Sequence, residues 1–573
     1  MKTRIAVHAL AVLSLVCTSA RAQWMQNGTG VCTVASGQYH PVAATDGAGG
    51  AIIAWEDSRN AGTAGIDVYV QRLDANGYPQ WTAGGVALCN ATGDQLSLSI
   101  VSDGAGGAIV AWGDTRSGGA HIYAQRVSSN GAGLWTSGGV LLCMAAPEQN
   151  FPVAVSDGAA GVIVAWLDTR TGDFDVYAQR VDASGVVQWT ATAAPICTVA
   201  GLQHSPFVTA DGAGGAIMAW TDERGLAPDI YAQRINAAGV VQWTAGGAAV
   251  CQAARTQSGG LLASDGAGGA IIAWTDGRLG NSVTLRDIYA QHVNGAGVAQ
   301  WVVNGAAVCG APGEQGYPTV VSDAAGGAII VWHDYRASNW DVYAQRMNGA
   351  GAAQWTANGV ALCTAAGTQW FVSSTPDGAG GAIVAWPDGR DGTGTNDIYA
   401  QRIDAAGAVK WSINGLALCA LPYDQHAPSV APDGAGGAIV AWDDMRSWDG
   451  VQQPSDPYFD IHANHVTASG WSVTGVERAP SASAALTPNV PNPFSSTTRF
   501  DLILDRESRA AVDVFDVAGR RVRHIDIGRA PAGRTTISFD GRDNRGYPLP
   551  SGAYFCRVTS NHARLTQKVL LVR

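Results

Sequence analysis

The sequence predicts an all-β protein, an eight-bladed β-propeller followed by a small C-terminal Ig-like β-sandwich. Two observations predict this fold. One unit of 54 to 60 residues recurs eight times between Trp24 and Trp471, and a period near 50 made of short strands and glycine turns is typical of propeller blades. The last 85 or so residues lack the repeat and consist of alternating strands separated by Gly and Asn turns, as in a small sandwich.

Each unit has fixed positions. A tryptophan opens it, a cysteine follows eight residues later, and a glutamine six residues after that. Next come an Asp-Gly-Ala-Gly-Gly turn, an apolar run ending in Ala-Trp, a Trp-x-Asp-x-Arg cluster and Asp-Ile-Tyr-Ala-Gln-Arg. The opening tryptophans are Trp24, Trp81, Trp135, Trp189, Trp243, Trp301, Trp355 and Trp411.

The third unit shows how one repeat forms a blade. Residues 151–156 form a short strand, and the turn at 157–161 supplies the positive φ values of a hairpin. The run Val162 to Trp166 is apolar at successive positions, so we expect this strand to be covered on both faces. Residues 175–181 and 186–190 give the third and fourth strands.

The two ends of the repeat region predict how the ring closes. The segment after Trp24 carries its cysteine and glutamine on schedule, whereas Ala479 stands eight residues past Trp471. We therefore expect the N-terminal strand, from about Gln23, to complete the last blade. The segment after Trp471 is then mainly exit and linker.

The N-terminus has the features of a cleaved secretory signal. Lys2 and Arg4 precede an apolar stretch from Ile5 to Val16, and small residues end at Ala22. No other apolar segment approaches the ~18 residues that cross a bilayer, so we expect no transmembrane helix in the mature chain. The predicted domains are a signal peptide at 1–22, the eight-repeat propeller at 23–475, a linker at 476–487 and the sandwich at 488–573.

Charge is distributed unevenly. The formal net charge is −11, yet residues 481–573 hold 14 Arg or Lys against 8 Asp or Glu. The repeat region is therefore strongly acidic. An acidic ring repels phosphate backbones, so we expect no nucleic-acid partner.

Several repeated residues could bind metal or form cross-links. Neighbouring blades place equivalent Cα atoms beyond the ~7 Å reach of a disulfide except close to the axis, and no Cys-x-x-Cys pair supports zinc. We expect buried free thiols that act as small apolar fillers. One Asp per glycine turn offers too few oxygens for calcium, so we predict no metal and no cofactor. The eight cysteines are Cys32, Cys89, Cys143, Cys197, Cys251, Cys309, Cys363 and Cys419.

Two further sets of residues recur in every unit. The sixteen tryptophans at the two fixed positions are expected to form blade-to-blade core. Asp168 and Arg170, with Asp175 nearby, have counterparts in other units and are expected to form an ion-pair staple between the second and third strands. A repeated ligand site is the alternative.

A local function should lie where the units differ. The connections from strand four to strand one and from strand two to strand three emerge on the same face of a propeller, and they carry aromatic and histidine residues. We expect a carbohydrate or a protein to dock there; the alternative is that these loop residues pack on one another. The candidates are Tyr39, His40, Phe151, His204, Tyr317, Tyr335, Trp340, Trp370, Phe371, His426 and Trp448.

The repeat pattern resembles a known group of propellers. Ala-Trp-x-Asp-x-Arg followed by Asp-Ile-Tyr, with an Asp-x-x-Gly-x-x-x-Trp turn, is similar to the sialidase and TolB-like group. The turn resembles the sialidase Asp-box but is one residue longer on each side of the glycine. Sialidases use three arginines, a Tyr with a Glu partner and an acid Asp. Here the arginines recur in every unit and no catalytic set stands out, so the resemblance implies fold more than chemistry.

The C-terminal region resembles the sorting domain of type IX secretion substrates. That domain is similar to the immunoglobulin-like domain of the flagellar hook-capping protein. The resemblance implies export to the periplasm and passage across an outer membrane, guided by secretion machinery that recognises this domain. The residues that carry it include Pro491, Asn492, Pro493, Phe494, Gly519, Gly552, Tyr554 and Lys568.

These observations predict a secreted or surface-displayed bacterial protein whose propeller is a binding or interaction module, more plausibly a binder than an enzyme. We expect it to be a monomer at the outer cell surface or outside the cell, with a glycan or a surface protein as partner. Two alternatives remain from other classes, a glycoside hydrolase of sialidase type and a structural surface-layer component. A hydrolase requires a pair of carboxylates in different environments, which the sequence alone does not assign.

Overall fold

A computed structural model describes residues 24–145, 148–279, 286–392, 394–446, 458–471, 484–486, 491–504, 508–517, 520–531, 533–560 and 564–573. The chain divides into two compact units, Met1–Val473 and Thr474–Arg573. All regular elements in the described residues are β-strands. Within the same residues, no helix has the length and apolar composition that a membrane crossing requires.

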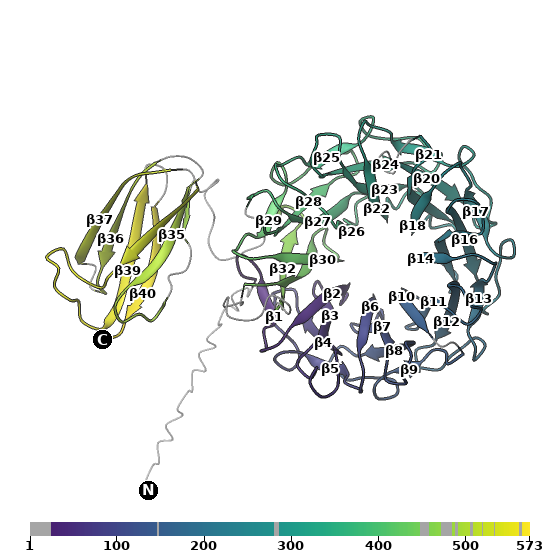
Figure 1. Ribbon diagram of the computed structural model, residues 1–573, viewed down its shortest axis with the longest axis horizontal. Helices are drawn as coiled ribbons and strands as arrows, with labels where there is room; N and C mark the ends of the chain where they lie inside the picture. The colour runs from purple at the N-terminus through teal and green to yellow at the C-terminus, as the bar shows by residue number, and fades with distance from the viewer. Residues whose placement is uncertain are drawn as a thin grey trace, which may run out of the picture. The chain divides into compact units, whose positions relative to one another are not determined.

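The first unit is a ring of antiparallel four-stranded sheets (Figure 1). We number them 1 to 8 in chain order. Sheets 1 to 3 contain β2 (Gln38–Thr45), β3 (Ala51–Asp57), β4 (Asp67–Leu73), β5 (Val86–Cys89), β6 (Gln95–Ser102), β7 (Ala108–Asp114), β8 (His121–Val127), β9 (Val140–Leu141), β10 (Gln149–Ser156), β11 (Val162–Asp168), β12 (Asp175–Val181) and β13 (Ala194–Cys197).

Sheets 4 to 6 contain β14 (Gln203–Ala210), β15 (Ala216–Asp222), β16 (Asp229–Ile235), β17 (Ala248–Cys251), β18 (Gln257–Ser264), β19 (Ala270–Asp276), β20 (Asp287–Val293), β21 (Ala306–Cys309), β22 (Gln315–Ser322), β23 (Ala328–Asp334), β24 (Asp341–Met347) and β25 (Val360–Cys363). Sheets 7 and 8 contain β26 (Ser373–Pro376), β27 (Ala382–Asp388), β28 (Asp397–Ile403), β29 (Leu416–Cys419), β30 (Gln425–Pro432), β31 (Ala438–Asp444), β32 (Asp460–Thr467) and β1 (Thr29–Cys32), with β33 (Gly470–Trp471) beside β32.

In each sheet the first strand lies nearest the hub and the fourth lies at the outer edge (Figure 1). Radial sheets of this kind define a β-propeller. Seven of the eight second strands, such as Val162–Asp168, are buried at every position, and β7 at every position except Gly113, because each sheet packs against neighbours on both faces. This confirms the expectation drawn from their continuous apolar sequence.

The ring closes through the N-terminal strand. β1 pairs with β32 and completes sheet 8, with Thr29 opposite Ala463. Gly28 lies under the Trp442 ring, and the Asn27 carbonyl accepts a hydrogen bond of 2.6 Å from Arg446 Nη2. Equivalent contacts occur within the other sheets, where Arg116 Nη2 donates to the Gly138 carbonyl at 2.9 Å. The predicted closure is therefore confirmed. β33 is an additional short partner of β32.

Tryptophans form the core between sheets, as expected. The tryptophan of each Trp-x-Asp-x-Arg cluster is fully buried, and Trp112 of sheet 2 packs on Ile52 and Ala54 of sheet 1. The opening tryptophans join sheets by hydrogen bonds, since Trp135 Nε1 donates to the Ala183 carbonyl of the next sheet at 3.1 Å. Each aromatic ring thus removes a large apolar area from water at a boundary between sheets.

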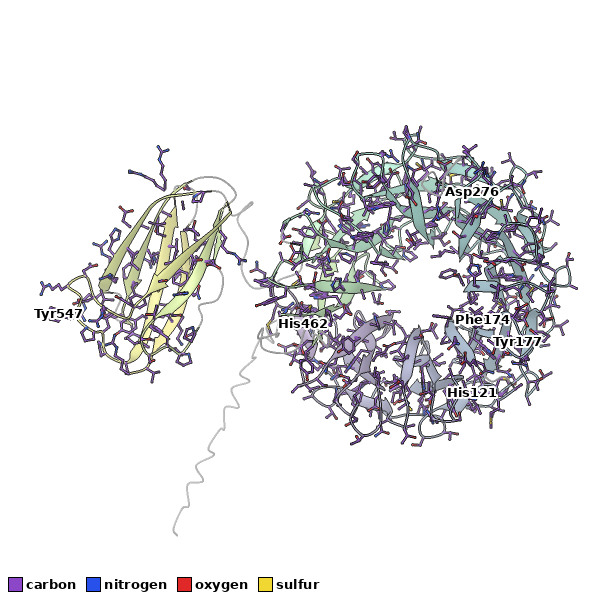
Figure 2. All side chains as sticks on the ribbon, in the orientation of Figure 1. His121, Phe174, Tyr177, Asp276, His462 and Tyr547 are labelled. Carbon is purple, nitrogen blue, oxygen red and sulfur yellow. The ribbon has the colours of Figure 1, made fainter. Side chains whose placement is uncertain are left out.

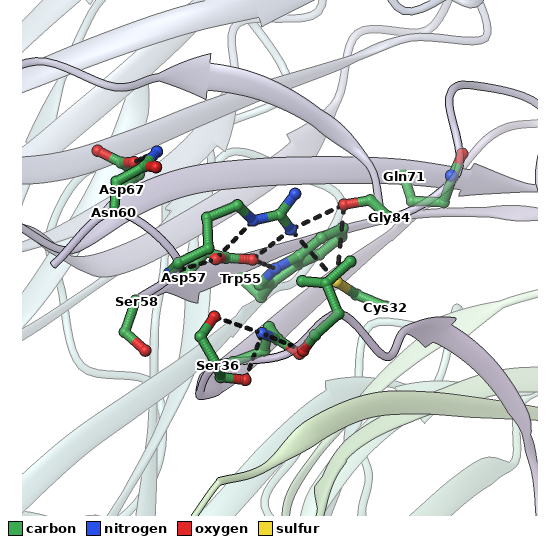
Figure 3. Close-up of polar contacts among 12 residues, drawn as sticks. Cys32, Ser36, Trp55, Asp57, Ser58, Asn60, Asp67, Gln71 and Gly84 are labelled. Atoms are coloured by element: carbon green, nitrogen blue, oxygen red, sulfur yellow. Dashed lines mark hydrogen bonds and ion pairs between the residues drawn. The ribbon is translucent and has the colours of Figure 1, made fainter.

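A polar staple accompanies each buried tryptophan. Asp57 accepts hydrogen bonds from Trp55 Nε1 at 2.8 Å and from Arg59 Nε at 2.8 Å (Figure 3). Arg59 Nη2 also reaches the Cys32 sulfur of the preceding sheet at 3.3 Å and the Gly84 carbonyl at 2.8 Å. The staple therefore connects neighbouring sheets as well as two strands of one sheet.

The thiols differ in part from the expectation. All eight repeat cysteines are free and buried, as predicted. Each is more than an apolar filler, however, because a guanidinium of the next sheet lies against its sulfur, as Arg116 does at 2.9 Å from Cys89. Burial raises the pKa of Cys89 to about 11, so the thiol stays protonated and can accept a weak hydrogen bond.

The second unit contains two sheets of antiparallel strands. One is β34 (Ala484–Leu486), β35 (Thr498–Leu504) and β38 (Gly533–Phe539). The other is β37 (Arg521–Ala530), β36 (Ser508–Phe515), β39 (Gly552–Ser560) and β40 (Arg564–Leu571). β34 falls inside the range 476–487 that the sequence assigns to a linker, so the strands of this unit begin before residue 488. In Figure 2, Tyr547 marks a turn of this unit.

Candidate functional site

Seven sheets begin their inner strand with a β-bulge, and sheet 7 has the same backbone conformation at Phe371, just before β26; we call this position the bulge in all eight sheets. Two residues after the repeated glutamine, the backbone takes a positive φ between 44° and 73°. The register to the second strand shifts at this point, for example between Tyr39 and Val42. Because all inner strands run in the same direction, the eight bulge residues surround one mouth of the ring. They are His40, Ser97, Phe151, Ser205, Gly259, Tyr317, Phe371 and Ala427.

Side chains of the preceding sheet hold several of these bulges. They occupy the first variable position of the Trp-x-Asp-x-Arg cluster, between the tryptophan and the aspartate; we call it position x. Glu56 Oε1 accepts from the Ser97 amide at 2.7 Å, and Thr275 Oγ1 accepts from the Tyr317 amide at 3.2 Å. A left-handed backbone at a non-glycine residue costs about 1–3 kcal/mol. These hydrogen bonds offset part of that cost and fix the direction of the bulge side chain.

The structure brings five of the sequence-predicted residues together on sheets 6 and 7. They form an aromatic cluster with His333, defined as Tyr317, His333, Tyr335, Trp340, Trp370 and Phe371. Its ring centroids are 5.1–6.4 Å apart along a continuous chain of contacts. Trp370 is nearly parallel to Trp340 and to Phe371, with interplanar angles of 28° and 19°.

The outer part of the aromatic cluster faces solvent. Phe371 is 71% exposed, Tyr317 64%, Tyr335 42% and Trp370 41%. Exposed large aromatic side chains grouped in one place mark interaction sites, since burial in the fold does not explain them. The arrangement is a set of ring faces available to a ligand.

A buried histidine and a half-buried asparagine position the aromatic cluster. His333 is 2% exposed, and burial lowers its pKa to about 4. Its neutral ring can therefore accept a hydrogen bond from the Val372 amide, 3.3 Å from Nε2. Asn339 Nδ2 donates to the Ala365 and Gly367 carbonyls, each at 3.0 Å. Both contacts tie sheet 6 to the segment that enters sheet 7, so Trp340 and Trp370 are held beside each other.

Three other predicted residues meet at the boundary of sheets 8 and 1. His40 Nδ1 lies 3.0 Å from Glu56 Oε2, and this hydrogen bond raises the His40 pKa. The His40 amide donates to Asp443 Oδ2 at 3.4 Å. His426 and Tyr39 both contact the Phe459 ring, at 5.9 and 5.8 Å. This group is charged and largely paired internally, unlike the aromatic cluster.

The remaining predicted residues lie apart from both groups. Phe151 occupies the bulge of sheet 3 and is 58% exposed. His204 pairs with Glu223 at 3.1 Å on sheet 4. Trp448 lies outside the described residues.

Sequence reasoning missed the residues that hold the bulges. Glu56, Thr275, His333 and Asp443 all occupy position x of an otherwise repeated cluster. Variation at one position inside an invariant motif is the signal that could have found them. The sequence did not reveal their role, because each side chain accepts a hydrogen bond from a backbone amide of the next sheet.

Two hollows in the described residues lie away from the mouth. The two clearest hollows have volumes of about 230 and 260 Å³. One is lined by residues such as Val86 and Trp135 at the outer edge, and the other by Phe515 and Phe555 of the second unit. Among the same residues, no three His, Cys, Asp or Glu side chains gather as metal ligands would. The aromatic cluster is therefore an open surface.

The motif residues of the second unit mainly build its fold. Phe494 is buried against Phe539 at 5.8 Å, and Asn492 Oδ1 accepts from the Leu570 amide at 2.9 Å. Pro491 accepts from Thr498 Oγ1 at 2.8 Å, and a cis peptide bond joins Asn492 to Pro493.

Three other motif residues lie along the last two strands of this unit, β39 and β40. The buried Tyr554 donates its hydroxyl to the Pro550 carbonyl at 2.8 Å. Gly552 and Lys568 are exposed, and Gly519 lies outside the described residues.

Comparison with known proteins finds a family match within the second unit. Residues 489–564 match the FlgD Ig-like domain. No curated protein matches the chain. Similar solved structures include polysaccharide lyase Uly1 (7% identity, 75% of this chain and 100% of that chain, TM-score 0.41) and the Hadza microbial sialidase Hz136 (11% identity, 61% and 73%, TM-score 0.33). FlgD from P. aeruginosa is 25% identical over 16% of this chain and 76% of its own, with a TM-score of 0.13.

The chain therefore consists of a β-propeller ring and a C-terminal unit with a FlgD-like Ig domain.

Proposed function

We propose that the ring is an eight-bladed propeller that binds carbohydrate through its aromatic cluster. Eight sheets and the pairing of β1 with β32 support the blade count. The observation that carries the binding role is the chain of near-parallel, exposed rings formed by Trp370, Phe371 and their neighbours. The C–H faces of sugar rings are apolar and stack on such surfaces, while their hydroxyls stay in contact with water.

The open shape of the surface favours binding over turnover. A hydrolase needs a pair of carboxylates beside the scissile bond, whereas none of the six members of the aromatic cluster carries a carboxylate. Asp443 and Glu56 lie on sheets 8 and 1, at a different part of the mouth, and each accepts a backbone hydrogen bond from a bulge.

A glycan array and a panel of fluorogenic glycosides test this proposal. We expect specific retention without turnover for the full mature chain, and loss of at least 10-fold in retention for Trp370→Ala. Tyr547→Ala, an exposed aromatic of the second unit (67% exposed), is the matched control and should bind as wild type. Turnover of a glycoside, or equal retention by Trp370→Ala and wild type, would contradict the proposal.

We further propose that the protein is secreted or displayed on the outer cell surface, after signal-peptide cleavage near Ala22. The FlgD-like Ig match and the motif around Pro491–Phe494 support a sorting role for the second unit, read by type IX machinery. Expressing the chain with and without residues 488–573 in a host that has this machinery tests the role. Export of the truncated chain to the surface would refute it.

A further inference from the structure

The bulge residue of sheet 3 has no structural explanation within the ring. Phe151 sits at the same backbone position as Ser97, Ser205 and Ala427, with a φ of 55°. Those smaller residues show that the bulge does not need a large side chain. Phe151 is 58% exposed, so its ring gains little from burial. A bulky residue in a left-handed conformation is also uncommon. The ring is therefore available for contact with something outside the fold.

Phe151 lies on the opposite side of the mouth from the aromatic cluster. Sheet 3 is four sheets away from sheet 7 in a ring of eight, so their inner strands, β10 and β26, are opposite each other (Figure 1). Cα atoms of neighbouring inner strands approach within 8 Å, so eight of them enclose a circle about 20 Å across. One sugar ring cannot touch both sides, but an extended chain can.

On the arc through sheets 4 and 5, the bulge positions between the two aromatic regions carry small side chains, whereas the other arc carries Ala427, His40 and Ser97. Going from sheet 3 to sheet 6, the bulge residues are Phe151, Ser205, Gly259 and Tyr317. A protein partner is expected to bury one continuous central cluster of anchors, whereas these aromatic regions are separated. Separated stacking faces with small and hydroxyl residues between them fit a linear chain of repeating rings.

We propose that the ligand is a linear polysaccharide that lies across the mouth of the ring. It stacks on Trp370 and Phe371 at one side and on Phe151 at the other. This inference rests on the proposed carbohydrate-binding function and adds that the ligand is a chain of several sugar units. Binding at the aromatic cluster alone would be enough for a short oligosaccharide, while Phe151 would contact only longer ones.

Calorimetric titration with oligosaccharide ladders tests the inference. The probes are cello-, xylo- and chito-oligosaccharides of two to about eight units, and the protein is the full mature chain. For a ladder that binds, we expect Phe151→Ala to weaken the longest member at least 10-fold and to leave the disaccharide unchanged. Phe371→Ala should weaken every member. Tyr547→Ala, which removes an exposed aromatic side chain of the second unit, is the matched control and should match wild type at every length.

The outcomes separate the inference from the proposed function. Binding that is equally strong in wild type and Phe151→Ala at every length would overturn the inference and leave the carbohydrate site standing. If Phe151→Ala lost as much affinity for the disaccharide as for the longest member, the inference would also be overturned and the carbohydrate site would still stand. Capture of a protein partner with no binding by any of the ladders would overturn both. Because alanine already occupies this backbone position at Ala427, Phe151→Ala is expected to fold.

Discussion

The outer edge and the mouth of the ring differ in how much they vary between sheets. At the outer edge, each sheet places an Asp–Arg pair against a cysteine of the preceding sheet, as with Asp114, Arg116 and Cys89. At the mouth, one backbone conformation carries His, Ser, Phe, Gly, Tyr or Ala. The difference shows that the repeated contacts between neighbouring sheets hold the ring together. The mouth can therefore change its side chains with little effect on the fold.

Removing the closing strand should have the largest effect. Deletion of residues 24–32 takes β1 from β32 and leaves Trp442 and Arg446 without their partners at Gly28 and Asn27. We expect a loss above about 5 kcal/mol, because a strand and its packing go together. Thermal unfolding followed by circular dichroism measures it. A melting temperature equal to that of wild type would show that the ring closes at another point.

A tryptophan between sheets should matter far more than an aromatic residue at the mouth. Trp112→Ala leaves a cavity between sheets 1 and 2 and should cost about 3–5 kcal/mol. Phe371→Ala removes an exposed ring and should change stability by about 0.5 kcal/mol or less. Denaturant unfolding of both variants measures the contrast. Equal losses of stability in the two variants would contradict the distinction between the core that joins the sheets and the side chains at the mouth.

The polar staple should be the next most sensitive feature. Asp114→Asn removes the charge that pairs with Arg116, and we expect a loss of about 3 kcal/mol because a buried pair is broken on one side. The exposed Asp173 offers a matched control, and Asp173→Asn should unfold as wild type. Chemical denaturation compares the two variants. If Asp114→Asn had the same free energy of unfolding as wild type, the staple would be dispensable for stability.

A half-buried acid at the start of β28 should make stability depend on pH. Burial, then repulsion from Asp391 and Asp388, raises the Asp397 pKa to about 7. The folded state therefore binds a proton more tightly than the unfolded state, whose Asp pKa is about 3.9. The stability from this group is complete below about pH 4 and is lost as the pH rises through 7.

Asp397→Asn should accordingly be more stable than wild type at pH 8, by roughly 2 kcal/mol, and similar to it at pH 4. Melting temperatures at the two pH values give the comparison. A stability gain for Asp397→Asn at pH 4 that is as large as at pH 8 would show that the Asp397 charge is not the cause.

The parts of the fold that repeat could be predicted from the sequence. Regular spacing indicated the first three strands of each sheet, but the fourth strand expected at 186–190 was wrong, because it lies at Ala194–Cys197 and 186–190 contains only a single bridge. The cysteine and glutamine on schedule after Trp24, against Ala479 after Trp471, indicated that β1 closes the ring. Five residues of the aromatic cluster could be named because they interrupt the repeat. The sequence did not show which of them contact one another, since Tyr317 and Phe371 come together through contacts between separate sheets.

Positive φ values at the bulges had no sequence signal, because only Gly259 among the eight residues is a glycine. The contact between each thiol and an arginine was missed for a related reason. It joins side chains 27 positions apart, such as Cys89 and Arg116, across a boundary between sheets. Reasoning within one repeat does not reach such a partner.

Hydrogen–deuterium exchange, with and without the oligosaccharide that the ring retains most strongly, tests the central claim most directly. We expect new protection in the segments that carry the bulges of sheets 6 and 7, around Gln315–Tyr317 and Gln369–Val372. The staples at the outer edge should exchange as before. Protection confined to the outer edge or to the second unit, with the mouth unchanged, would contradict the claim that the variable mouth of a repeated ring is its binding surface.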